Sequence, residues 1–96
     1  MKVIFTDQAE ENLEEIGDYI ANKNPDRAET FVGELRQRAL NIGTFPEAYQ
    51  VVGRYENFKV RRCVHGDYLI FYRIAKRQVE VFLIVHGAKH FDLNRF

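Results

Sequence analysis

The chain has a single cysteine, no tryptophan and no long apolar run. Because Cys63 has no second thiol to pair with, no disulfide can form within the chain, which fits a reducing compartment. The opening residues, MKVIFTDQAEENL, turn acidic at once and lack the apolar core of a secretion signal. No apolar stretch approaches the roughly 20 residues needed to span a bilayer. We therefore expect a soluble, cytoplasmic protein with no membrane association.

Metal ligands are scarce as well. Cys63, His65, His86 and His90 do not match a known zinc pattern, which needs three or four ligands at suitable spacing, so we expect no metal and no cofactor. No histidine is clearly placed to act as a base for Cys63. The thiol is therefore interpreted as a small side chain facing the core rather than as a nucleophile.

The net charge of zero conceals an uneven distribution of charge along the chain. Residues 1–50 carry five basic and ten acidic residues, whereas residues 51–96 carry nine basic and four acidic ones. The basic half could meet nucleic acid or an acidic protein surface. Alternatively, the two halves simply attract each other within the fold.

The first half of the sequence predicts a strand followed by two helices. Lys2–Phe5 is short, β-branched and aromatic, and Thr6 and Asp7 are good helix caps. Asn24 and Pro25 suit the start of a second helix. Apolar residues recur at helical spacing in both helices: Ala9, Leu13, Ile16 and Ile20 in the first, and Ala28, Phe31, Val32, Leu35, Ala39 and Ile42 in the second.

The second half predicts a meander of three strands at Phe58–Val64, Tyr68–Ala75 and Val79–His86, with short separators suited to hairpins. The preceding segment, Glu47–Asn57, is expected to be a loop with a bulged strand start. Residues 1–96 thus form one α+β domain with the order β-α-α-β-β-β. We expect the helical hairpin to pack on one face of a twisted antiparallel sheet and to leave the other face uncovered.

Basic side chains are expected to gather on the uncovered face of this sheet, where Lys59, Arg61, Arg62 and Arg73 lie on neighbouring strands. His86, Lys89 and His90 leave the last strand toward the same region. Guanidinium groups suit phosphate because their donors form a planar fork, and histidine suits proton transfer near neutral pH.

Each of these residues also has a purely structural interpretation. Arg73 could pair with Glu56 or Glu80, and Arg61 and Arg62 could be ordinary charges on a strand surface. His86 could be a strand-end residue with local hydrogen bonds. Lys89 and His90 could belong to a solvated tail.

Four segments, in order, resemble the ParE branch of the RelE/ParE toxin superfamily from bacterial type II toxin–antitoxin (plasmid stabilisation) systems. They are VIFTDQAEENLEEIGDYIANKNPDRA, TFPEAYQVVGR, VRRCVHGDYLIFYRI and VEVFLIVHGAKHF. The first is similar to the family's opening strand and helix pair, and the others to its loop, hairpin and closing strand. The resemblance runs from Val3 to about His90 and implies the fold expected above.

The resemblance implies two functions of different kinds. ParE-like toxins are binding inhibitors that poison DNA gyrase and leave broken DNA, whereas RelE-like relatives cut messenger RNA on the ribosome without a metal. In a nuclease of the second kind, Arg61 or Arg62, together with Arg73 and His90, would form the catalytic set, with Glu56 as an added base. Phe91 stands where a catalytic tyrosine is wanted, and its ring has no hydroxyl to move a proton. We therefore expect gyrase inhibition, with an RNA endonuclease or an inactive family member as alternatives.

The resemblance also implies a cognate antitoxin whose disordered segment wraps the toxin. Its expected contacts are Phe31, Leu35, Phe45, Arg61 and Arg73, with a helix in the groove between the second helix and the sheet. An acidic antitoxin segment on the basic half would bind less tightly as salt rises.

The C-terminal tail is expected to be the edge that recognises the target. Its contact residues would be His86, Lys89, His90 and Arg95. We expect no sequence-specific binding of nucleic acid by the chain itself. A homodimer or a toxin–antitoxin hetero-oligomer is the expected assembly.

Overall fold

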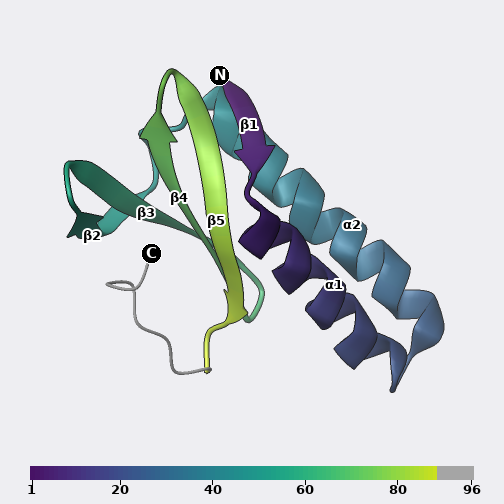
Figure 1. Cartoon of the computed structure of the whole chain (residues 1–96). Helices are drawn as coiled ribbons and strands as arrows, with labels where there is room; N and C mark the ends of the chain where they lie inside the picture. The colour runs from purple at the N-terminus through teal and green to yellow at the C-terminus, as the bar shows by residue number, and fades with distance from the viewer. Residues whose placement is uncertain (89–96) are drawn as a thin grey trace.

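A short N-terminal strand leads directly into two helices, and four further strands complete the chain (Figure 1). The computed structural model describes residues 1–88. The elements are β1 (Lys2–Phe5), α1 (Asp7–Ala21), α2 (Pro25–Asn41), a 3-10 turn (Ile42–Thr44), β2 (Gln50–Tyr55), β3 (Phe58–His65), β4 (Tyr68–Ala75) and β5 (Gln78–His86). This confirms the α+β class and the predicted order of the helices and of the three-strand meander.

The five strands form one sheet in the order β1-β5-β4-β3-β2, and this sheet is mixed rather than wholly antiparallel. β1 pairs with β5 in parallel, from Lys2–Gln78 to Phe5–Val81, so the expectation of an antiparallel sheet is wrong at this edge. The long connection through both helices and three strands permits a parallel pair, which no hairpin could form. Within Glu47–Asn57, expected to be a loop with a bulged strand start, Gln50–Tyr55 is a full edge strand with a bulge between Val51 and Gly53.

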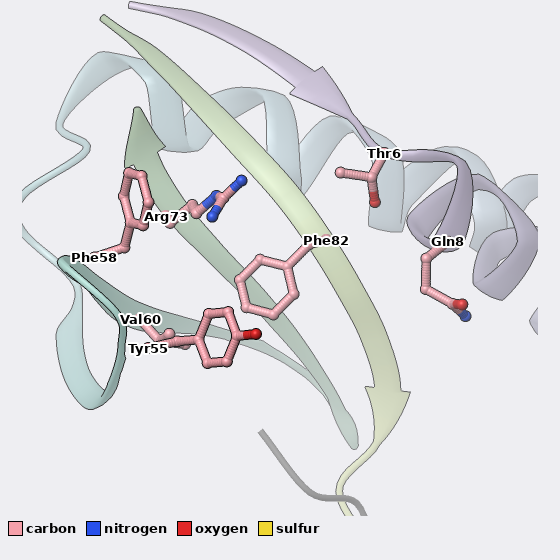
Figure 2. A pocket seen from close by; sticks show the side chains of 7 residues that line it. All are labelled: Thr6, Gln8, Tyr55, Phe58, Val60, Arg73 and Phe82. Atoms are coloured by element: carbon pink, nitrogen blue, oxygen red, sulfur yellow. The ribbon is translucent and has the colours of Figure 1, made fainter. Parts of the chain in front are cut away.

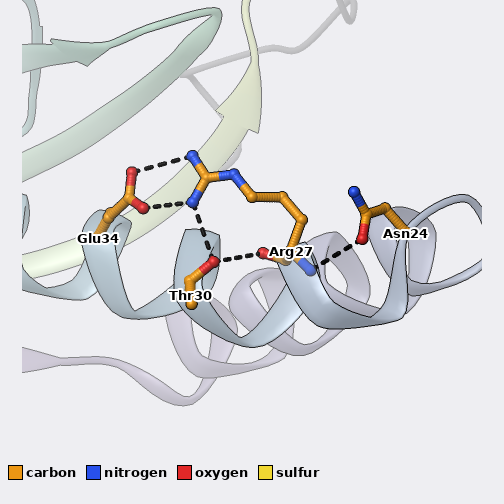
Figure 3. Close-up of polar contacts among 4 residues, drawn as sticks. All are labelled: Asn24, Arg27, Thr30 and Glu34. Atoms are coloured by element: carbon orange, nitrogen blue, oxygen red, sulfur yellow. Dashed lines mark hydrogen bonds and ion pairs between the residues drawn. The ribbon is translucent and has the colours of Figure 1, made fainter.

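Both helices begin where the sequence predicts them. The Thr6 side chain accepts a hydrogen bond from the Ala9 backbone N–H at 3.2 Å, and Asn24 Oδ1 accepts one from the Arg27 N–H at 3.1 Å. Near the start of α2, the Arg27 guanidinium forms a bidentate ion pair with Glu34 and also donates to the Thr30 hydroxyl (Figure 3). None of the helices within residues 1–88 is both long and apolar enough to cross a membrane.

The α1–α2 hairpin lies against one face of the sheet, and neither helix covers the other face (Figure 1). The main core forms between the helices and the covered face, where Cys63 and Tyr72 are fully buried. Residues from both helices, the 3-10 turn, β4 and β5 complete this core: Ala9, Leu13, Ile16, Leu35, Ala39, Ile42, Tyr68, Ile70, Val79, Val81 and Ile84. The predicted core position of Cys63 is confirmed, and burial raises the pKa of its thiol.

One buried polar side chain joins the helical layer to the sheet. β1 stops pairing with β5 at Phe5–Val81, and the Thr6 N–H then donates to the Val81 carbonyl at 2.9 Å. Further along β5, Asn12 Oδ1 accepts a hydrogen bond from the Ile84 N–H at 3.0 Å. Asn12 is only 7% exposed, so this side chain replaces a strand as the partner of a buried backbone donor.

The ion pairs do not join the acidic half of the sequence to the basic half. Within residues 1–88, Arg27–Glu34 lies inside α2, Arg36–Glu10 links the two helices, and Arg73–Glu80 links β4 to β5. Each pair thus connects residues of the same half. Within the described residues, no ion pair therefore supports the interpretation that the two halves of the sequence attract each other.

Replacing the buried amide tests its role as a link between layers. We expect Asn12→Ala to lower the free energy of unfolding by about 1–3 kcal/mol, because the buried Ile84 N–H loses its acceptor. For a domain of this size, each 1 kcal/mol corresponds to roughly 4–8 °C in the thermal midpoint. Gln37→Ala, which removes an exposed amide bonded only to Asn41, is the control. Equal thermal midpoints for the two variants would contradict the account.

Candidate functional site

The face of the sheet that the helices leave uncovered carries a second, smaller apolar cluster. Val60, Phe71, Leu83 and Val85 are its buried members, and Val52, Tyr55, Leu69 and Phe82 pack around them. A classical alternation of strand residues would not place Phe82 and Leu83 on the same face. The register of β4 against β5 shifts between Phe71 and Tyr72, which brings both residues into this cluster.

A hollow of about 240 Å³ opens at this cluster, and Figure 2 shows its lining. Three aromatic rings surround it, from Tyr55, Phe58 and Phe82, and Arg73 supplies its one charged group. Sequence reasoning did not select these aromatic residues as site residues. The signal that could have found two of them is their position on either side of the Glu56-Asn57 turn, where paired strands place them together.

Arg73 is held in place inside this hollow. Its Nε donates to Glu80 Oε1 at 2.9 Å, and its guanidinium carbon lies 4.3 Å from the centre of the Phe58 ring. Of the interpretations offered by the sequence, the pairing with Glu80 is confirmed. The ion pair and the cation–π contact fix the side chain but leave it facing the hollow (Figure 2).

Arg61 lies on the opposite face from Arg73. Its Nη1 donates to the backbone carbonyls of Glu47 at 2.9 Å and Tyr49 at 2.7 Å, and so holds the loop between α2 and β2. Lys59 shares this face through strand alternation, whereas Arg62 lies with Arg73 and donates to Gln50 Oε1 at 3.2 Å. The expectation that these basic residues gather on one face is therefore wrong.

Tyr72 holds the same loop from beneath. Its hydroxyl donates a hydrogen bond to the Pro46 carbonyl, and burial raises its pKa to about 12. Because the hydroxyl keeps its proton at neutral pH and is already engaged, Tyr72 is a structural group rather than a base. Together, Arg61 and Tyr72 fix the position of the loop that carries Phe45.

His86 ends β5 at the far end of the sheet from Arg73. Its Nδ1 accepts a hydrogen bond from the Ala88 N–H at 3.1 Å, and its ring meets Tyr68 edge-on, with 5.2 Å between centres. This confirms the interpretation of a strand-end residue with local hydrogen bonds. His86 lies six positions along β5 from Glu80, the residue that pairs with Arg73, which is about 20 Å in a strand. The expectation that His86 leaves the strand toward the Arg73 region is therefore wrong. Lys89, His90 and Arg95 lie outside the described residues.

The residues expected to bind the antitoxin have three different environments. Leu35 is fully buried in the core and is not exposed to a partner in this structure, so its expected role as a partner contact stays a prediction. Phe31 is half-buried between α2 and the sheet, where it packs against the rings of His65 and Tyr68. Phe45 is 70% exposed, which makes it the most exposed large apolar residue described.

No metal centre is formed by the described part of the chain. Residues 1–88 contain no group of three or more histidine, cysteine, aspartate or glutamate side chains placed to hold a metal ion. What the described residues offer instead is an aromatic hollow, an exposed phenylalanine on a fixed loop, and charged strand ends. Surfaces of these kinds suit the binding of other macromolecules.

A helical hairpin on one face of a five-stranded sheet defines an α+β toxin fold of the RelE/ParE type. The family model described as the ParE toxin of type II toxin–antitoxin system, parDE, matches residues 3–91, and the chain therefore belongs to the ParE toxin family. It is the toxin component of such a system. No curated protein matches the chain.

The raised pKa of Tyr72 predicts a loss of stability at alkaline pH. An unfolded tyrosine releases its proton near pH 10, whereas the folded chain retains this proton up to about 12. Between these values the unfolded state binds fewer protons, so the free energy of unfolding falls as pH rises. Chemical denaturation from pH 8 to 11.5 should show a smaller fall in Tyr72→Phe. Parallel curves for the two proteins would contradict this assignment.

Proposed function

We propose that this toxin acts by binding and inhibiting DNA gyrase in the cytoplasm, and that a cognate antitoxin holds it inactive. The observation that carries this proposal is that each arginine expected in a nuclease site is already engaged within the fold, Arg61 with loop carbonyls, Arg62 with Gln50 and Arg73 with Glu80. Arg61 lies on the face that the helices cover, whereas Arg62 and Arg73 lie on the other face.

Cutting RNA without a metal requires several groups around one phosphate: a base for the 2′-hydroxyl, cations for the developing negative charge, and an acid for the leaving oxygen. Arg61 Nη1 donates to two backbone carbonyls, and Arg73 Nε donates to the Glu80 carboxylate. Arg61 and Arg73 project from opposite faces of the sheet, and Arg62, which shares a face with Arg73, donates to Gln50. A binding inhibitor needs no such convergence, and this favours gyrase over the ribosome.

The proposed antitoxin contact centres on Phe45 and the neighbouring edge strand. Phe45 projects from a loop that Arg61 and Tyr72 hold fixed, so its ring is presented to a partner at little cost in conformational entropy. β2 follows this loop and forms one edge of the sheet, where an extended segment can add a strand. Arg61 then acts by positioning the loop, and Arg73 offers a charge to a segment that crosses the aromatic hollow.

A supercoiling assay tests the proposed target. Purified toxin, freed of antitoxin, is titrated into gyrase with relaxed plasmid and ATP, and protein-trapped cleaved DNA is scored. We expect supercoiling to be lost and linear DNA to accumulate, and added antitoxin to prevent both. Unchanged supercoiling at large molar excess would contradict the proposal.

If supercoiling is unchanged, the toxin is tested next on translating ribosomes. Cleavage of messenger RNA there would identify an endonuclease, with Arg61, Arg62, Arg73 and His90 as the residues to replace. Inactivity in both assays, with tight antitoxin binding retained, would identify an inactive family member that acts only as a binding partner.

The antitoxin surface is tested separately with Phe45→Ser. An exposed aromatic anchor that becomes buried in a complex contributes enough that its loss should weaken antitoxin binding about tenfold or more. Tyr19→Ser removes a similarly exposed ring, 59% accessible, from α1 and should leave the affinity unchanged. Titration calorimetry over a range of salt should also show weaker binding at high salt. Equal affinities for the two variants would move the antitoxin to another surface.

A further inference from the structure

Exposed cations gather at one end of the sheet. The β2–β3 turn follows the Tyr55–Phe58 pair and the β4–β5 turn follows Ala75, and the strand register places both turns at the end away from His65. β1 also begins there, because Lys2 pairs with Gln78. Five exposed basic residues lie at or beside these turns: Lys2, Arg54, Lys59, Lys76 and Arg77.

Two features of this cationic end are unfavourable for the fold alone. Arg54 and Lys59 lie directly opposite each other in the β2–β3 pair, and like charges in that position repel. Lys76 and Arg77 form a two-residue turn in which both have positive φ, 54° and 60°. Asn-Gly adopts such a turn with little strain, whereas two long side chains do so at a cost. Local stability therefore does not explain this choice of residues.

The positive charge at this end is not neutralised within the described chain. None of the five side chains forms a hydrogen bond or ion pair with another of residues 1–88, although the basic residues on the helices mostly do. Exposed acids lie on both helices and in loops, and α1 carries a row of them at Glu11, Glu14, Glu15 and Asp18. Near the cationic end they are Glu56, within a turn, and Glu47, which lines a pocket with Lys59. The molecule thus has one acidic layer and one cationic end.

We infer that the cationic end binds the phosphate backbone of duplex DNA without reading its sequence. Lysine and arginine on protruding turns are the usual source of contacts to phosphates, which fix position but carry no sequence information. The centre of a protein–protein interface is instead depleted of lysine and enriched in aromatic residues. That composition occurs at Phe45 and at the aromatic hollow, where Tyr55 and Phe58 line the uncovered face next to the β2–β3 turn. Arg54 and Lys59 alternate to the other face of the sheet.

This inference goes beyond gyrase inhibition and does not depend on it. A toxin that holds DNA through one end could present another surface to an enzyme already bound to that DNA. Because the contact is electrostatic and independent of sequence, it should act on any duplex and fall steeply with salt. It is therefore measured with toxin and DNA alone.

The test is fluorescence anisotropy of a labelled random-sequence duplex over a series of salt concentrations. We expect the logarithm of the association constant to fall linearly with that of salt, by about 0.9 per phosphate contact. The variant Lys76→Asn/Arg77→Gly removes two cations and lowers the backbone strain of the turn, because Asn-Gly adopts positive φ more readily. If both cations contact phosphates, affinity at about 0.1 M salt should fall by roughly 60-fold, since each contact contributes about eightfold relative to 1 M.

Two controls separate binding from folding and from net charge. The thermal midpoint of Lys76→Asn/Arg77→Gly should equal or exceed that of the wild type, so a loss of binding cannot reflect unfolding. Lys23→Gln/Arg27→Gln removes the same number of positive charges from the connection between the helices and from the first turn of α2, and should retain DNA binding. Equal loss in both variants, or no loss in either, would overturn the inference. So would a poly-glutamate peptide that binds as tightly as DNA, which would assign this end to an acidic protein.

Discussion

The fold depends on one hydrogen bond, from the Ile84 N–H on β5 to the buried side chain of Asn12 on α1. β5 is longer than β1, so part of its edge extends past the last strand pair and needs another partner. Because the partner comes from the first helix, the helical layer and the sheet are fixed in register with each other. Together with the parallel pairing of β1 and β5, this contact places the helical hairpin against one face of the sheet.

Because both helices cover one face of the sheet, the side chains on its two faces have different roles. The covered face holds the core. On the same face, the side chains of Tyr72 and Arg61 fix the loop around Phe45. The other face keeps an aromatic hollow with Arg73 at its side. A layered fold of this kind offers several binding surfaces at once, and it engages Arg61, Arg62 and Arg73 in structural contacts. That arrangement suits a toxin that works by contact better than one that works by catalysis.

Much of this arrangement is predictable from sequence because it is local. Helical spacing, the Thr6 and Asn24 caps and the β-branched strands are set by neighbouring residues, and the structure confirms them. The same spacing already placed Leu35 on the buried stripe of α2, which conflicts with a contact to a partner. The β2 segment has a weak strand pattern, because Gly53 and Arg54 interrupt its apolar alternation, and the sequence therefore predicts only a bulged strand start there; pairing with β3 completes the strand.

The rest required three-dimensional contacts that no local pattern encodes. Nothing near Asn12 in the sequence indicates that β5 will lack a strand partner at Ile84. The faces of Arg61 and Arg62 follow from strand alternation, but their separation from a common site depends on which face the helices cover. The bulge that turns Phe82 toward the hollow likewise depends on the register of β4 against β5.

The central claim is that this ParE-family toxin acts on DNA through gyrase and leaves RNA intact. The most direct measurement is to induce the toxin in bacterial cells without antitoxin, and to isolate plasmid DNA and messenger RNA from the same samples. The account predicts linear plasmid with protein attached to its ends, while transcripts analysed by primer extension remain uncut at the earliest times. Transcripts cut within codons, with the plasmid still supercoiled, would contradict it.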